Sequence, residues 1–258
     1  MKQKVVAVIP ARMASSRFPG KPLAMILDLP MIEHVRRRVA LSPVLDDVFV
    51  ATCDQEIFDA VTSCGGNAVM TKDSHERCTE RIEEAAHKID LDIAVIVQGD
   101  EPLFDPKALD NLVSPILNDT SIICTNLISV IEREEDHHNT DIVKTVLDEK
   151  QFVMYFSRAP IPYPKTKKHV LYRQTGISAF TKQFLHKYAT LPPTSLEIAE
   201  SIDLLRIIGH GYSIRGVVYN GETVGVDRPD DVAHVERILL KDSKQNELYE
   251  TILNYGKK

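Results

Sequence analysis

Three cations stand close together just after the first apolar segment of the chain. Lys4–Ile9 is a short run rich in β-branched residues, which is typical of a strand buried on both faces. The loop after it contains Arg12, Arg17 and Lys21 among small residues whose backbone could approach a phosphate closely. Open α/β sheets bind ligands beyond the carboxyl ends of their strands. The pattern therefore predicts an anion site, and the alternative is a basic surface loop.

Carboxylates in two later loops predict a place for a divalent cation. The apolar segment 92–97 leads into Gln98-Gly-Asp100-Glu101, and Asp227 lies on a loop before a predicted helix. An acidic pair at the end of a buried strand suits Mg²⁺, a hard cation that takes oxygen ligands and shares its sites with substrate phosphates. The alternative for the Asp100–Glu101 pair is an acidic turn that caps the following helix.

A basic loop for phosphates, combined with separated carboxylates for Mg²⁺, is typical of phosphoryl or nucleotidyl transfer. Arg77 and Arg81 lie four residues apart near the start of a predicted helix, where positive charge opposes the helix dipole. An anionic ligand beside that helix would explain their position. The sequence contains no P-loop motif, dinucleotide fingerprint or Ser-His-Asp arrangement that favours another chemistry.

The composition is that of an ordinary globular protein. The 258 residues, of which 43% are hydrophobic and 26% charged, can bury the core of a large α/β domain. The net charge of -6 argues against a dedicated nucleic-acid binder. The four cysteines lack zinc spacing and indicate reduced thiols. Because no secretory signal is visible and no apolar run approaches the ~20 residues of a membrane helix, we expect a cytoplasmic protein without a membrane partner.

Strand and helix patterns alternate through the first half of the chain at βαβ spacing, which predicts a parallel sheet with right-handed crossovers. We expect an α/β protein with a three-layer Rossmann-like fold and a mainly parallel central sheet. Arg36, Arg37 and Arg38 are expected on the solvated side of their helix. The strands expected in this half are 4–9, 47–52, 67–71, 92–97 and 121–129, and the helices are 30–40, a segment ending near 63, a segment from about 74–79 to 89, and 107–118.

The middle of the chain has a more antiparallel pattern. Residues 142–147 and 152–156 predict a β-hairpin, and the prolines of 157–164 predict a rigid extended connector. We expect one domain over 1–258, in which residues about 131–192 form a smaller antiparallel lobe or dimerisation arm. The remaining expected elements are a solvated loop at 132–139, strands at 170–180 and 212–219, one amphipathic helix at 192–208 capped by Thr194 or Ser195, and helices at 229–241 and 244–254.

Motifs along nearly the whole chain resemble the 3-deoxy-manno-octulosonate cytidylyltransferase family, also called CMP-Kdo synthetase. The most specific blocks are Gln98-Gly-Asp-Glu-Pro102 and Ser157-Arg-Ala-Pro-Ile-Pro162. The supporting segments are Ile9–Pro22, Pro30–Ile32, Val50–Thr52, Tyr155–Phe156, Leu196–Arg206 and Gly225–Asp231. The resemblance implies a nucleotidyltransferase that uses CTP and Mg²⁺. It would couple CMP to the anomeric hydroxyl of a 2-keto-3-deoxy sugar acid and release pyrophosphate.

The resemblance also implies a role for each residue that matches a family motif. The implied nucleotide-binding residues are Arg12, Arg17, Lys21, Arg77 and Gln98. The implied catalytic residues are Lys21, Asp100 and Asp227, of which the two acids bind Mg²⁺. The implied sugar-binding residues are Arg158, Gln174, Ser178 and Glu197. A homodimer and a place in lipopolysaccharide biosynthesis are further implications of the family.

Two segments depart from the family's usual pattern. Glu76–Arg81 replaces Ser-Gly-Thr-(Asp/Glu)-Arg, and Arg173–Ser178 lacks the His and Tyr of a strand that lines the family's sugar site. Losing an imidazole and a phenol changes hydrogen bonding where selectivity is decided. The acceptor could therefore be Kdo, a modified ulosonic acid or, less readily, a phosphonate. Hypotheses from other classes are a metal-dependent glycosyltransferase, which usually has an Asp-x-Asp motif not found here at a strand end, and a non-catalytic nucleotide sensor.

Overall fold

The computed structural model describes residues 2–15, 17–75, 77–166, 169–221 and 224–256. Ser16 and Glu76, which belong to segments discussed above, lie outside the described residues. The chain divides into two compact units. Unit 1 comprises residues 1–91, 96–110 and 223–258, and unit 2 comprises 92–95 and 111–222. The lobe predicted at 131–192 lies within unit 2, which begins earlier and ends later.

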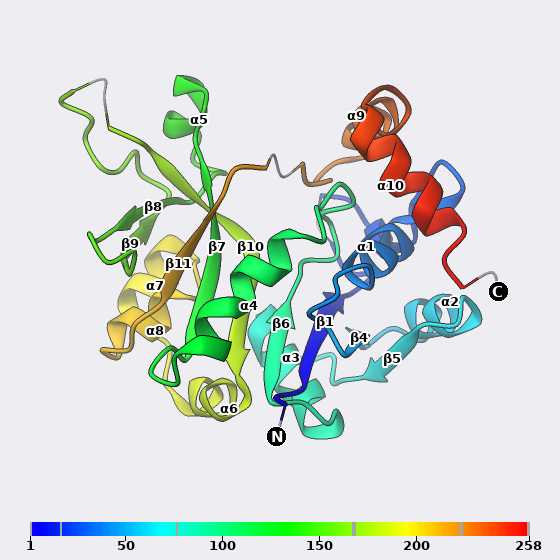
Figure 1. Ribbon diagram of the computed structural model, residues 1–258, viewed down its shortest axis with the longest axis horizontal. Helices are drawn as coiled ribbons and strands as arrows, with labels where there is room; N and C mark the ends of the chain where they lie inside the picture. The colour runs from blue at the N-terminus through cyan, green and yellow to red at the C-terminus, as the bar shows by residue number, and fades with distance from the viewer. Residues whose placement is uncertain (1, 16, 76, 167–168, 222–223, 257–258) are drawn as a thin grey trace. The chain divides into compact units, whose positions relative to one another are not determined.

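Unit 1 contains three parallel strands that lie side by side, β1 (Val5–Ala11), β4 (Asp47–Thr52) and β5 (Asn67–Met70) (Figure 1). Residues Val5 to Ile9 of β1 are at most 1% exposed. Burial on both faces explains why this strand is a continuous apolar run without alternation. The three predicted strands are confirmed, and β1 ends at the loop that contains the three cations.

The helices of unit 1 also follow the predicted order. They are α1 (Met31–Val39), α2 (Gln55–Ser63), α3 (Cys78–Lys88), α9 (Pro229–Lys241) and α10 (Ser243–Leu253). A single 3-10 turn, η1 (Lys21–Leu23), precedes a small hairpin of β2 (Met25–Ile26) and β3 (Leu29–Pro30). The C-terminal helices hold this hairpin: Glu236 Oε1 accepts a hydrogen bond from Leu27 N at 2.9 Å, and Tyr249 Oη donates to Asp28 Oδ2 at 2.6 Å.

The prediction that the arginine triplet of α1 lies on a solvated side is wrong. Arg36, Arg37 and Arg38 are at most 8% exposed. The fully buried Glu33 accepts hydrogen bonds from Arg36 Nε at 2.6 Å and from Arg37 Nε at 2.7 Å. Arg38 Nη1 donates to Gln245 Oε1 at 2.7 Å, and burial lowers the pKa of Arg38 to about 10. The helix sequence alone cannot reveal that α10, some two hundred residues later, covers this face.

The buried Glu33 carboxylate gives a prediction for stability. Glu33→Ala leaves two buried guanidinium groups without their anion, so we expect it to lower the free energy of unfolding by about 3–5 kcal/mol. Urea denaturation followed by circular dichroism measures the change. The exposed Glu56 of α2 is the control, because Glu56→Ala should change stability by less than about 0.5 kcal/mol. A loss below about 1 kcal/mol for Glu33→Ala would show that the arginines do not depend on this carboxylate.

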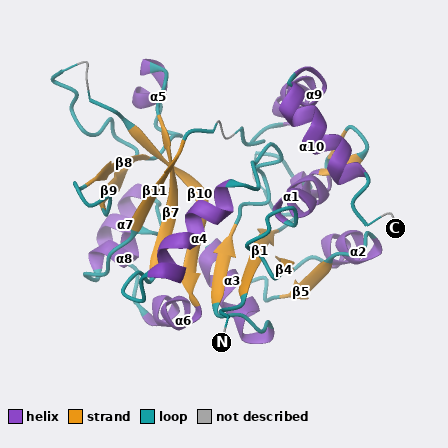
Figure 2. Ribbon diagram, viewed as in Figure 1, coloured by secondary structure: helices purple, strands orange, loops and turns teal. Residues whose placement is uncertain are grey.

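Unit 2 is mixed in strand direction. β7 (Cys124–Val130) pairs antiparallel with β10 (Tyr172–Thr181) and parallel with β11 (Arg215–Tyr219). β8 (Lys144–Leu147) and β9 (Val153–Ser157) form the predicted hairpin, and β8 also pairs with β10 (Figure 2). β6 (Ile93–Ile96) begins in unit 2 and ends in unit 1. The remaining helices are α4 (Ala108–Asn118), α5 (Glu134–His138), α6 (Lys182–Thr190), α7 (Ser195–Glu200) and α8 (Leu205–Gly209).

Two predictions for this unit are wrong. The single helix expected at 192–208 is broken into α7 and α8, because Ser201 adopts the left-handed region with φ 54°. The segment 132–139, expected as a solvated loop, contains α5 with a buried His137. The helix cap expected at Thr194 or Ser195 is confirmed at Thr194, which forms a capping box at the start of α7. Within the described ranges, none of the helices is long and apolar enough to cross a membrane.

Candidate active site

A cavity of about 350 Å³ lies at the carboxyl end of β1 in unit 1. Its wall brings together the basic loop, the start of α3 and the loop after β6. All five residues predicted to bind the nucleotide line it: Arg12, Arg17, Lys21, Arg77 and Gln98. Asp100 also lines the cavity. The predicted anion site is therefore one continuous surface built from segments far apart in the sequence.

The Lys21 ammonium lies between the two predicted metal ligands. Its Nζ is 2.6 Å from Asp100 Oδ2 and 3.7 Å from Asp227 Oδ1. Arg17 Nη2 lies 3.0 Å from the same oxygen of Asp227. The Lys21 side chain is only 13% exposed, whereas those of Asp100 and Asp227 are 35% and 52% exposed. The cation is thus held from within unit 1, and both acids can still be reached by a ligand.

Backbone hydrogen bonds fix the two acidic loops against each other. Val226 N donates to Asp100 O at 2.9 Å, and Val226 O accepts from Lys21 Nζ at 2.7 Å. Asp231 Oδ2 accepts from the backbone N–H of Asp227 at 2.8 Å, at the start of α9. A carboxylate in the first turn of a helix satisfies N–H groups that have no partner within the helix. Asp227 is therefore held by the helix that follows it.

These carboxylates fit a divalent cation of the Mg²⁺ type. Asp100 and Asp227 offer oxygen ligands, they share one positively charged partner, and they are partly exposed. Mg²⁺ is usually held by one or two protein carboxylates, with the remaining positions left for water and substrate phosphates. The chemistry of the donor set therefore agrees with the ligands expected from the sequence.

The start of α3 adds residues that the motif match did not assign. Cys78 lines the cavity, and its Sγ accepts a hydrogen bond from Gln98 Nε2 at 3.5 Å. His75 also lines the cavity, and its Nε2 lies 2.6 Å from Glu84 Oε2. Burial raises the pKa of Glu84, but hydrogen bonds from Lys72 N, His75 and a nearby lysine outweigh it and lower the pKa to about 2. Glu84 thus remains ionised and orients the imidazole.

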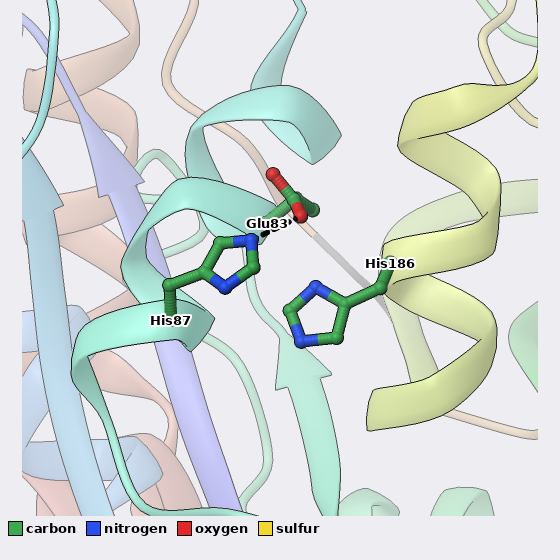
Figure 3. A group of neighbouring side chains, drawn as sticks. All are labelled: Glu83, His87 and His186. Atoms are coloured by element: carbon green, nitrogen blue, oxygen red, sulfur yellow. Dashed lines mark hydrogen bonds and ion pairs between the residues drawn. The ribbon is translucent and has the colours of Figure 1, made fainter.

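Arg81 has a more structural position than its sequence neighbours suggest. It lines the cavity but is only 3% exposed, and its Nη1 donates to Thr71 Oγ1 and to Lys72 O. Farther along α3, Glu83 Oε1 and His87 Nε2 lie 2.7 Å apart in a surface pair, and Figure 3 shows them one helical turn from each other. Figure 3 also labels His186, which belongs to α6 of unit 2.

The four residues predicted to bind the sugar all belong to unit 2. Gln174 and Ser178 flank a register shift in β10, where they lie opposite Ile128 and Asn126 of β7. Directly opposed residues of an antiparallel pair share a face, and Ile128 and Asn126 are two residues apart, so Gln174 and Ser178 share a face as well. The Oε1 atom of Gln174 is buried and has no hydrogen-bond partner among the described residues.

Glu197 and Arg158 have very different surroundings. Glu197 is 1% exposed, and both its carboxylate oxygens accept hydrogen bonds from Arg206, at 2.6 and 2.8 Å. This buried ion pair joins α7 to α8, and the role of Glu197 as a sugar ligand stays a prediction. Arg158 directly follows β9 and is half-buried. It forms no ion pair with a carboxylate in the part of the chain that the structure describes.

Comparisons with known proteins agree with this geometry. A family profile described as cytidylyltransferase matches residues 6–224. The 3-deoxy-manno-octulosonate cytidylyltransferase of Geobacter metallireducens is 40% identical over 250 residues, which are 92% of this chain and 98% of that protein. The enzyme of the same name from Syntrophus aciditrophicus is 42% identical over 243 residues, which are 92% and 98% of the two chains.

A solved structure gives the same result. CMP:2-keto-3-deoxy-manno-octonic acid synthetase in complex with CTP superposes with a TM-score of 0.88 and 37% identity. The match covers 93% of this chain and 99% of that chain. The predicted α/β fold with a mainly parallel central sheet and a smaller antiparallel region is confirmed. The basic cavity, the paired acids and these likenesses lead to one conclusion: the chain belongs to the 3-deoxy-manno-octulosonate cytidylyltransferase family of nucleotidyltransferases.

Proposed function

We propose that this protein transfers CMP from CTP to the anomeric hydroxyl of a 2-keto-3-deoxy sugar acid and releases pyrophosphate. The observation that supports this most directly is the Lys21 ammonium held between Asp100 and Asp227 at the wall of a basic cavity. The names of the relatives at about 40% identity favour Kdo as the acid.

In this proposal the basic loop holds the triphosphate. Arg12, Arg17, Lys21 and Arg77 line one cavity, so their charges act together on the phosphate oxygens. When the acceptor hydroxyl attacks the α-phosphorus, negative charge builds on the leaving pyrophosphate. Preorganised cations stabilise that charge without having to rearrange during the reaction. Gln98 lines the same cavity, and in this proposal it contacts the base.

We further propose that Asp100 and Asp227 hold Mg²⁺. When bound, Mg²⁺ neutralises and orients phosphate oxygens and so lowers the barrier to displacement. The Lys21 ammonium now occupies the carboxylate oxygens that would hold the ion. A cation at those oxygens would free the charge of Lys21 for the triphosphate. The two acids would then act through positioning and charge, in agreement with the general mechanism of phosphoryl transfer.

The acceptor is the less constrained half of the reaction. Arg158 carries a positive charge suited to the carboxylate of a sugar acid. Gln174 and Ser178 stand where relatives usually have an imidazole and a phenol, so an amino-substituted or otherwise modified ulosonic acid is the second candidate acceptor. A phosphonate acceptor would use the positive charge of Arg158 but none of the contacts to a sugar ring, which makes it the weaker candidate. Membership in the family disfavours a glycosyltransferase or a non-catalytic nucleotide sensor.

Pyrophosphate release tests the proposed activity. With CTP, Mg²⁺ and Kdo we expect release that stops when EDTA is added, because the acids alone do not neutralise the triphosphate. Phosphorus-31 NMR of the quenched reaction measures the pyrophosphate directly, so the readout itself does not depend on Mg²⁺. If pyrophosphate were released with an amino-substituted ulosonic acid but not with Kdo, the proposed reaction would hold with a different acceptor. Absence of release with every acid tested, for protein that binds CTP, would contradict the proposed reaction.

The two acids give a sharper test of the site. Asp100→Asn and Asp227→Asn should each lower kcat by on the order of 10²–10³-fold, because each removes a charge that the transition state needs. Asp230→Asn is the matched control, since Asp230 is an exposed aspartate in the first turn of α9, close to Asp227 in the sequence. Circular dichroism checks that each variant folds. If either acid variant kept near-normal turnover, the metal assignment would be wrong.

We also propose that the protein forms a homodimer through unit 2. Nine large hydrophobic residues are exposed in the described part of the chain, and five of them fall between residues 154 and 198. These five are Met154, Tyr163, Val170, Leu196 and Ile198. A concentration of exposed apolar side chains is typical of a protein–protein interface. A second copy of this chain is the partner that the family resemblance favours.

The cytoplasmic location stays a prediction from the sequence. The place in lipopolysaccharide biosynthesis stays a prediction of the family resemblance.

One substitution tests the dimer. Ile198 is 66% exposed on α7, and Ile198→Asp should shift the protein towards the monomer, because a charge buried at an interface is costly. Light scattering coupled to size-exclusion chromatography measures the mass. Leu240→Asp on α9 of unit 1, at a residue that is 61% exposed, should leave the dimer intact. A wild-type monomer, or a dimer unaffected by Ile198→Asp, would contradict this interface.

A further inference from the structure

Glu200, which no motif assigns, holds the segment that contains Arg158. The segment follows β9 in unit 2. Glu200 Oε1 accepts a hydrogen bond from Ser157 Oγ at 2.5 Å, and Glu200 Oε2 accepts one from Arg158 N at 2.9 Å. Ser157 Oγ in turn accepts a hydrogen bond from Ala159 N at 3.0 Å. One carboxylate therefore determines the path of three consecutive residues.

The guanidinium of Arg158 is also oriented from the same place. Its Nε donates to the backbone O of Glu200 at 2.9 Å, and its Nη1 donates to Thr140 O at 3.0 Å. Both contacts are to backbone carbonyls, which orient the planar group without neutralising its charge. The five N–H groups of an arginine form a rigid fork, so these two contacts leave donors on the remaining edge of the fork. Such an edge suits a carboxylate ligand.

A second cation lies close to this arginine. Lys144 is fully buried, and its Nζ donates to Asn139 O and to Ile142 O, both at 2.7 Å. Burial lowers the pKa of Lys144, and the neighbouring charge of Arg158 lowers it further, while Glu200 acts in the opposite direction. Lys144 and Arg158 thus place two positive charges near the one negative charge of Glu200. The local surplus of positive charge favours an anionic ligand.

The position of Glu200 is itself well determined. It is the last residue of α7, directly before the left-handed Ser201 that ends the helix. The buried pair of Glu197 and Arg206 fixes α7 against α8, and the Thr194 capping box fixes its other end. Glu200 thus lies at the end of a short, well-anchored helix, from which its carboxylate contacts the segment after β9.

We propose that Glu200 is a positioning residue for the acceptor: it holds the Arg158 guanidinium in the orientation that binds the carboxylate of the sugar acid. This inference rests on the proposed function, because it takes Arg158 as the group that contacts the acceptor. It assigns Glu200 no direct contact with the substrate. It also accounts for a Glu in α7 that the ion pair with Arg206 does not use.

Steady-state kinetics with Kdo and CTP tests the role. Glu200→Gln removes the carboxylate charge and leaves a single oxygen for the two donors, Ser157 Oγ and Arg158 N, so the segment after β9 is held less firmly. We expect the KM for Kdo to rise about tenfold or more, with the KM for CTP within about twofold of the wild type. Ser157→Ala is the milder second variant, should Glu200→Gln fold poorly. Glu149→Gln is the matched control, because Glu149 is an exposed glutamate of the same unit.

A double variant separates positioning from general stability. If Glu200 acts through Arg158, adding Glu200→Gln to Arg158→Ala should raise the KM for Kdo little further. An equal rise in both KM values, or additive effects in the double variant, would overturn the positioning role. If Arg158→Ala itself left the KM for Kdo unchanged, the proposed acceptor site would fail instead. If Arg158→Ala raised the KM for Kdo and Glu200→Gln did not, only the positioning role of Glu200 would fail.

Discussion

The structure of unit 1 depends on one interaction, the Lys21 ammonium held between the carboxylates of Asp100 and Asp227. The three residues come from the two ends and the middle of the chain. Two carboxylates that lie close together are stabilised by a cation between them, and the Lys21 ammonium supplies that charge. The backbone of Val226 donates a hydrogen bond to Asp100 O and accepts one from Lys21 Nζ. These two bonds join the loop of Asp227 to the loop of Asp100 and to Lys21. The candidate site thus combines the loop after β1 and the loop after β6 with a segment from near the end of the chain.

The C-terminal helices are therefore part of the site, although none of their residues was predicted to bind substrate. α9 begins directly after Asp227, and Glu236 and Tyr249 hold the hairpin that follows Lys21. α10 also contacts the buried arginines of α1: Glu33 accepts hydrogen bonds from Arg36 and Arg37, and Gln245 of α10 accepts one from Arg38. Polar contacts of this kind specify where a helix docks, because a shifted helix would leave buried charges without partners.

Much of this could be predicted from the sequence, and the failures have a common cause. Apolar runs revealed the buried strands, and motif spacing revealed the cations and the Asp100 carboxylate that line one cavity. The burial of the arginine triplet and the hydrogen bonds of Glu200 depend on partners far away in the chain, which periodicity cannot show. A charged residue in a helix is normally exposed to solvent, so the helix sequence predicts an exposed Arg38. Only the folded chain shows that Arg38 is buried and donates a hydrogen bond to Gln245. The motifs do not predict the contact between Cys78 and Gln98 either.

The central claim is that Lys21, Asp100 and Asp227 form a triphosphate–metal centre. The dissociation constant of CTP, measured by titration calorimetry with and without Mg²⁺ and with UTP for comparison, tests it most directly. We expect Mg²⁺ to strengthen the binding of CTP by about tenfold or more, because the ion would neutralise the phosphates beside the two acids. An affinity for CTP that does not change with Mg²⁺ would contradict it.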